Sequence, residues 1–207
     1  MRFKIPVAIA VAAAIAVTGC GSDSEPAAGG HDGHDSSTST AAGGNGVDRA
    51  FVAAMIPHHE SAVDMAEMAE ERGQSGFVKQ LAGDIIRTQN EEIATMRRED
   101  AELAKAGVKR SDLGVADHAM GMDGDMSKLE TADPFDPAFV KMMIPHHEGA
   151  VIMAKAELAK GADPELKALA QDIIDAQERE IEEMRVSGLV PEDTESGGMD
   201  SEEHSGH

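Results

Sequence analysis

The sequence predicts an all-α protein, a four-helix bundle made of two duplicated helical hairpins. Three observations support this prediction: one part of the central region repeats another, apolar residues recur at helical spacing, and strand-forming side chains are sparse. The chain has no Trp, no Tyr and five Phe among its 207 residues. A core must therefore rest on Ala, Ile, Leu, Val and Met, which suits closely packed helices better than sheets.

The duplication is visible in a direct alignment of the chain with itself. Residues 48–97 align without a gap on residues 136–185, at a constant offset of 88, and 26 of the 50 aligned pairs are identical. The strongest block, Met-Ile-Pro-His-His-Glu, occupies 55–60 and again 143–148. The expected segments are a signal peptide (1–19), a tether (20–46), a duplicated four-helix domain (47–187, with repeats 48–106 and 136–187 joined by a connection at 107–135) and an acidic tail (188–207).

Each repeat has the pattern of two helices. Apolar residues follow alternating spacings of four and three, which is typical of helices packed in a bundle. We expect Asp48 and Asp136 to cap the first helix of each repeat, the second with Pro137 at its first helical position. Gly73 and Gly161 are expected to end these helices. The connection is long enough to cross the length of a bundle, so simple up-down and ferritin-like crossover topologies both remain open.

The N-terminus has the pattern of an export signal. Arg2 and Lys4 precede an apolar stretch at 5–17, which is too short for a comfortable membrane span. It ends in Val-Thr-Gly-Cys, which resembles a bacterial lipobox and implies cleavage before Cys20 and acylation of its thiol. An ordinary cleaved signal and an uncleaved anchor are the alternatives. We expect a protein held by lipid to the outer face of the bacterial cytoplasmic membrane.

The charge of the chain limits its partners. The formal net charge is −21 at pH 7, and such a surface repels nucleic acid and anionic lipid head groups. Cations are the natural small partners. Cys20 is the only cysteine, so a disulfide within the chain is excluded.

A polar layer is expected inside each hairpin. His58 lies in the apolar stripe of the first helix, and the length of the hairpin places it opposite Gln89 and Glu92 of the second. Imidazole and thioether groups at these positions suit a transition metal, copper above all. The predicted ligands are Met55, His58, His59, Met65, Met143, His146, His147 and Met153, with second-helix partners Gln89, Glu92, Met96, Gln177, Glu180 and Met184. A purely structural layer that fixes helix register is the alternative.

The connection carries a second group of candidate ligands. His118, Met120, Met122 and Met126 lie among Gly and Asp, at spacings that do not form a helical core stripe. Thioether sulfur suits Cu(I), and imidazole suits Cu(II), Zn and Ni. We therefore expect an accessory metal loop there. Short His-bearing stretches in the tether and the tail point the same way but weakly.

The Met-Ile-Pro-His-His block and the downstream Gln-x-x-Glu-Ile-x-x-Met block resemble a bacterial family catalogued as domain of unknown function 305. The resemblance covers about residues 47–187. It implies an exported, ferritin-like helical bundle, and association of some members with copper binding and copper resistance. It assigns no reaction.

Two other functions remain open at this point. A di-metal oxidase on the same bundle needs a Glu-x-x-His pair on each of two helices, but Val63 and Thr95 stand three residues after Glu60 and Glu92. A metal-free structural or interaction lipoprotein is the other. We favour extracytoplasmic copper sequestration or delivery, without catalysis.

Overall fold

The computed structural model describes residues 43–190. The predicted signal peptide, Cys20, most of the tether and the tail from residue 191 lie outside the described residues. The described part is all-helical, as predicted, and contains no strand. Its elements are α1 (Gly46–Arg72), α2 (Gly76–Lys105), a 3-10 turn η1 (Asp117–Met120), α3 (Met126–Thr131), α4 (Phe135–Lys160) and α5 (Pro164–Val186). None of these helices is long and apolar enough to cross a membrane.

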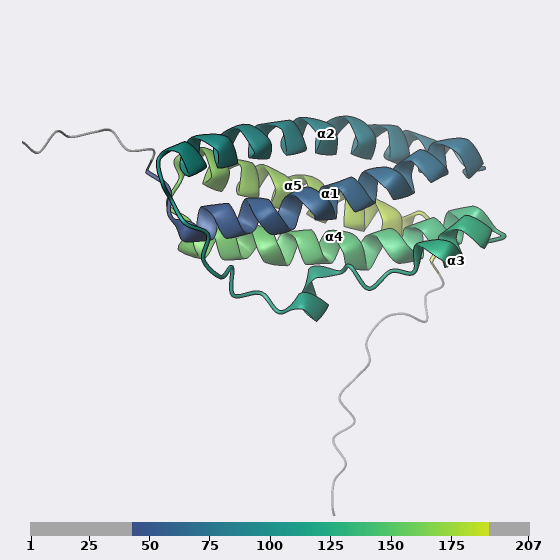
Figure 1. Ribbon diagram of the computed structural model, residues 1–207. Helices are drawn as coiled ribbons and strands as arrows, with labels where there is room; N and C mark the ends of the chain where they lie inside the picture. Colours follow the sequence, from purple (N-terminus) through teal and green to yellow (C-terminus); the bar gives the residue numbers. More distant parts are fainter. Residues whose placement is uncertain (1–42, 191–207) are drawn as a thin grey trace, which may run out of the picture. The chain divides into compact units, whose positions relative to one another are not determined.

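The four long helices form a bundle in which α1 packs on α2 and α4, and α4 packs on α5 (Figure 1). Each hairpin is antiparallel. The connection between α2 and α4 runs back along the length of the bundle, so that α4 begins near the end of α1 (Figure 1). This decides between the two topologies left open by the sequence: the chain has a crossover, as in ferritin-like bundles.

The apolar stripes fill the interior as their spacing predicts. Two buried clusters form, one toward each end of the bundle. The first includes Phe51, Met55, Met96, Met153 and Ile173, and the second includes Met65, Ile85, Phe139, Met143 and Met184. The paired histidines at 58–59 and 146–147 lie at the level between these clusters, so the polar layer divides one core into two.

Neither Asp48 nor Asp136 is the N-cap residue that was expected, although Asp48 accepts the N–H of Asn45 as part of a capping box. The N-cap of α1 is Asn45, and α4 begins after Pro134. Asp48 and Asp136 lie inside the first turn of their helices, where each carboxylate reaches the loop of the opposite hairpin. Such loops carry backbone N–H groups without partners at a helix start.

These two contacts are reciprocal. Asp48 accepts the N–H groups of Ala162 and Asp163 at 2.9 and 2.8 Å, and Asp136 accepts those of residues 74 and 75 at 2.9 and 2.8 Å. The donors of one loop lie 88 residues after those of the other. The hairpins therefore pack with approximate two-fold symmetry, each closing the loop of its partner.

The crossover is fixed at two points. Leu113 and Leu129 are buried at its two ends. The Lys160 ammonium donates to the Leu113 carbonyl at 3.2 Å, and the Arg72 guanidinium donates to the Leu129 carbonyl at 2.9 Å. Arg72 and Lys160 occupy the same repeat position. The segment between the anchors, residues 114–128, is called the strap below.

Candidate metal centre

Two of the four paired histidines form a hydrogen bond to a glutamate of their own hairpin. His59 Nε2 lies 2.7 Å from Glu92 Oε2, and His147 Nε2 lies 2.7 Å from Glu180 Oε2. Both imidazoles are fully buried. The expected pairing of helix one with Glu92 and Glu180 therefore exists, but it is made by the second histidine of each pair. A carboxylate behind an imidazole is the arrangement that commonly orients a metal-ligating histidine.

The first histidine of each pair faces the other repeat. The rings of His58 and His146 stack between α1 and α4, with centroids 3.8 Å apart and planes tilted by 36°. His58 was expected opposite Gln89 and Glu92; the contact with Glu92 is made by His59 instead. Adjacent residues on a helix point about 100° apart, so only one of two adjacent histidines can face its own hairpin. The other must face the neighbouring helix.

Burial keeps this stacked pair neutral. Desolvation, then the nearby His59, lowers the pKa of His58 to about 3. Desolvation, then His58, lowers the pKa of His146 as well. A neutral imidazole carries one ring nitrogen with a free lone pair, which is the form that binds metals.

Several of these buried polar atoms lack a hydrogen-bond partner. His58 Nε2 lies 2.9 Å from the Met120 carbonyl, to which it donates, leaving Nδ1 as the lone-pair nitrogen. Unpartnered buried atoms in the layer are Nδ1 of His58, His59 and His147, both ring nitrogens of His146, Oε1 of Gln89, and both amide atoms of Gln177. Leaving a buried polar atom unpaired costs about 1–3 kcal/mol. These atoms are therefore the ones in the layer that are available to a ligand.

The predicted thioethers surround this layer. Met55, Met65, Met96, Met143, Met153 and Met184 are all at most 1% exposed and belong to the two apolar clusters. Within residues 43–190, no three His, Cys, Asp or Glu side chains form a group that could hold a metal ion. The donors that lie beside the buried imidazoles are thioethers, and the two together make a donor set that suits soft ions.

The predicted loop ligands lie along the strap. His118 is exposed, Met122 is 44% exposed, and Met120 and Met126 are half-buried. Sequence reasoning missed Met142 of α4, whose side chain lies directly against Gly124 of the strap. The aligned residue in the first repeat is Ala54, so a comparison of the two repeats was the available signal.

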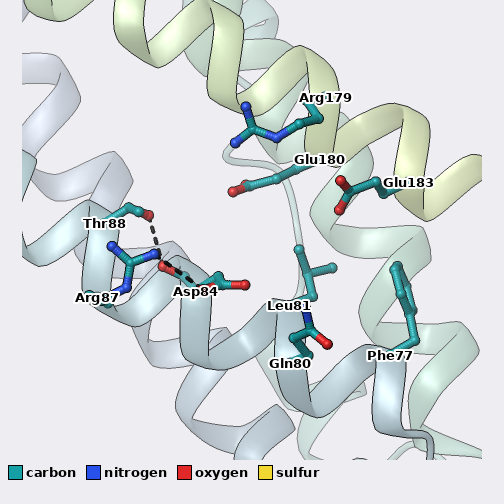
Figure 2. Close-up of a pocket in the computed structure, with 9 residues that line it drawn as sticks. All are labelled: Phe77, Gln80, Leu81, Asp84, Arg87, Thr88, Arg179, Glu180 and Glu183. Carbon is teal, nitrogen blue, oxygen red and sulfur yellow. Dashed lines mark hydrogen bonds and ion pairs between the residues drawn. The ribbon is translucent and has the colours of Figure 1, made fainter. Parts of the chain in front are cut away.

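A polar pocket opens between α2 and α5 (Figure 2). Its volume is about 270 Å³. Figure 2 shows Glu180 and Glu183 reaching from α5 toward the space beside α2, where Asp84 and Arg87 form an ion pair at 3.2 Å. Because Glu180 also holds His147, this pocket brings solvent to the outer end of the buried pair.

The fold and the layer define a class of protein: a duplicated four-helix bundle whose repeats meet at buried histidines, with methionines above and below. Residues 48–187, and separately 16–100, match the family model described as Domain of unknown function (DUF305). The chain belongs to this family, as its motifs predicted.

Solved structures share the fold. CopM in the Cu(I)-bound form is 37% identical, with a TM-score of 0.58 over 68% of this chain and 94% of that one. CopM in the Cu(II)-bound form is 36% identical, with a TM-score of 0.59 over 68% and 94%. A DUF305 fragment from Deinococcus radiodurans is 31% identical, with a TM-score of 0.58 over 70% and 96%.

One curated relative matches over a short stretch. Uncharacterized protein L153 of Acanthamoeba polyphaga mimivirus is 45% identical over 49 residues, which span 24% of this chain and 32% of the viral protein. The match thus covers about a third of that relative.

Proposed function

We propose that this protein binds copper outside the cytoplasm, held to the membrane by lipid on Cys20, and sequesters or delivers the ion without turning over a substrate. The observation that carries the proposal is the stacked His58–His146 pair, which is buried, neutral and supplied with unpartnered ring nitrogens. Similarity to CopM, whose structures hold Cu(I), Cu(II) and silver, supports copper as the metal. A DUF305 protein of Streptomyces coelicolor, described as a candidate secreted protein, supports the location.

The donors present fit copper. Imidazole binds both Cu(I) and Cu(II), and thioether sulfur selects Cu(I). His59 and His147 have carboxylate partners that orient their rings, while Nδ1 of each is unpartnered. The negative surface raises the local concentration of cations around the bundle.

The test removes the stacked pair. The double variant His58→Ala with His146→Ala is melted with and without stoichiometric copper, followed by far-ultraviolet circular dichroism because the chain has no Trp or Tyr. Ligand binding to the folded state raises its stability by mass action. We expect a large copper-dependent rise in melting temperature for the wild type and loss of most of it in the variant.

The matched control is Phe51→Leu with Phe139→Leu, which changes two buried residues at one repeat position without removing a donor. It should be less stable than the wild type yet retain the full copper-dependent shift. Absence of that shift in the wild type, or its persistence in the histidine variant, would contradict the proposal.

A metal-free structural lipoprotein is the second candidate. The His59–Glu92 and His147–Glu180 contacts favour it, because buried hydrogen-bonded pairs can fix helix register without a ligand. In that case the histidine variant is strongly destabilised without metal, and copper changes neither melt.

A further inference from the structure

We infer that the strap, residues 114–128, is a gate over the stacked histidines, and that a soft monovalent cation reaches them only when the Met120 carbonyl releases His58. The inference rests on the proposed function, since it concerns access to that same site. It assigns to the crossover a role in regulating metal uptake, beyond joining the two hairpins.

The strap is held firmly at its ends and lightly between them. Leu113 and Leu129 anchor it, with hydrogen bonds from Lys160 and Arg72. No residue from 114 to 128 is buried. Segments with few buried contacts open at far lower free energy than a core does. The strap can therefore open while the four-helix bundle stays folded.

The centre of the strap is seated by close backbone contact. The Met120 carbonyl accepts the Nε2 proton of His58 at 2.9 Å. A Cβ added at Gly149 of α4 would clash with that same carbonyl oxygen, so no larger residue fits there. Gly121 turns the chain with a φ of +70°, and a Cβ added there would clash with the Pro145 carbonyl. These contacts press the strap against the helix that carries His146.

The second repeat departs from the first where it meets the strap. Gly149 replaces Ser61, and Met142 replaces Ala54. Gly149 admits the Met120 carbonyl, and Met142 packs against Gly124 of the strap. Among the positions at which α4 differs from α1, these two lie against the strap, and both shape α4 to receive it.

The closed strap also restrains the ring that would bind. Imidazole lone pairs lie in the ring plane, so the direction of the His58 Nδ1 lone pair changes only when the ring turns. The ring of His146 lies 3.8 Å away between centroids, with its plane tilted by 36°. His58 cannot turn while its Nε2 is bonded to Met120. Opening the strap breaks the hydrogen bond to His58, so that its ring can turn, and at the same time exposes the two histidines.

The side chains on the strap are suited to the same cation. Met122 is exposed, Met126 is half-buried, and Met142 lies beneath Gly124. Thioethers hold soft ions such as Cu(I) and Ag(I) and discriminate against Mg²⁺ and Ca²⁺. An ion bound by these sulfurs would lie beside the closed strap.

The test compares Gly149→Ser, which installs the first-repeat residue, with Gly83→Ser. Gly83 is also a helical glycine, and an added Cβ there meets only Glu70, at an ordinary 3.5 Å. Three properties are measured on purified protein: the ¹⁵N shifts of the His58 ring, amide hydrogen exchange over the strap, and the association rate of Ag(I). Silver(I) is the probe because it is soft and does not change oxidation state.

We expect Gly149→Ser to remove the protected Nε2–H of His58, to raise hydrogen exchange over 117–124, and to speed Ag(I) association at least tenfold. Gly83→Ser should leave all three unchanged. Lys160→Gln, which loosens one anchor through an exposed side chain, should act in the same direction by two- to threefold, and covers the case in which Gly149→Ser fails to fold.

The outcomes separate the two ideas. If the wild type binds no Ag(I), both the proposed function and the proposed gating role of the strap are refuted. If the wild type binds Ag(I) and the strap variants open the strap without changing the rate, the gate alone is overturned. Entry through the pocket between α2 and α5 would give that second result.

Discussion

Glu157 provides a test of how the protonation of a buried carboxyl group affects the stability of this bundle. Its side chain is fully buried at the end of α4, and neither carboxyl oxygen has an N–H or O–H donor from elsewhere in the described chain. The first-repeat residue at this position is Ala69. Burial, then contact with the Asp48 carboxylate, raises the pKa of Glu157 to about 8.

Asp48 behaves in the opposite way. Burial alone would raise its pKa, but the neighbouring Glu157 side chain and hydrogen bonds from the N–H groups of Asn45, Asp163 and Ala162 lower it. Asp48 therefore stays ionised while Glu157 is held in its protonated form. The loop between α4 and α5 depends on this arrangement, since Asp48 closes that loop.

The sign of the pH dependence of folding stability follows from the raised pKa of Glu157. The folded pKa of about 8 exceeds the ordinary glutamate pKa of 4.5, so the stabilising contribution is complete below pH 4.5 and is lost as pH rises toward 8. At about 1.4 kcal/mol per pKa unit the upper bound is about 5 kcal/mol. Relaxation and water entry reduce such values, and we expect about 2–4 kcal/mol.

The perturbation is Glu157→Gln, which keeps the side-chain length and a donor to Asp48 but cannot ionise. The free energy of unfolding is measured by urea titration at pH 5, 7 and 9, with circular dichroism as the signal. The wild type should lose about 2–4 kcal/mol between pH 5 and 9, and the variant should lose much less. Glu182→Gln, an exposed change in α5, should retain the wild-type slope. Equal slopes in the wild type and Glu157→Gln would refute the reasoning.

Two further predictions concern the anchor and the strap. Cys20→Ser should release the protein from the membrane fraction or leave its precursor uncleaved, as judged by fractionation and mass spectrometry. Normal processing with unchanged membrane association would rule out lipidation. Changing Met120, Met122 and Met126 together to Leu should lower Cu(I) stoichiometry, measured by competition with a chromogenic chelator, while helical content stays intact. Unaltered Cu(I) binding would leave the strap without a role as an accessory site.

Much of the fold could be predicted because local patterns determine it. The repeat is gapless, and the glycines at 73 and 161 and the caps at Ser75 and Asp163 mark the turns of both hairpins, where the structure has them. The topology was left open because a connection of this length allows either course. The anchoring of Leu113 and Leu129 against residues far along the chain selects the crossover.

The candidate site was predicted in composition but not in arrangement. Periodicity within one hairpin shows which residues are buried and which helix faces them, and it led to Glu92 and Glu180. It carries no information about packing between repeats, so the stacking of His58 on His146 could not be derived. The contacts of Asp48 with Ala162 and Asp163 could not be derived for the same reason, since a carboxylate at a helix start predicts only its local capping bond, here with Asn45.

The duplication itself explains where function and asymmetry lie. When two similar hairpins pack reciprocally, a residue near their symmetry axis meets its own copy, as His58 meets His146. One mutation in an ancestral hairpin then changes both halves of the site. The strap has no second copy, so it must cross this symmetric surface on one side only. Gly149, Met142 and Glu157 all belong to the second repeat and replace Ser61, Ala54 and Ala69 of the first. The first two meet the strap directly, whereas Glu157 contacts the Asp48 carboxylate that closes the loop after α4. A chain reverted at Gly149 and Met142 should keep the bundle and the stacked histidines but lose the seated strap, because both positions meet the strap and neither belongs to the metal layer.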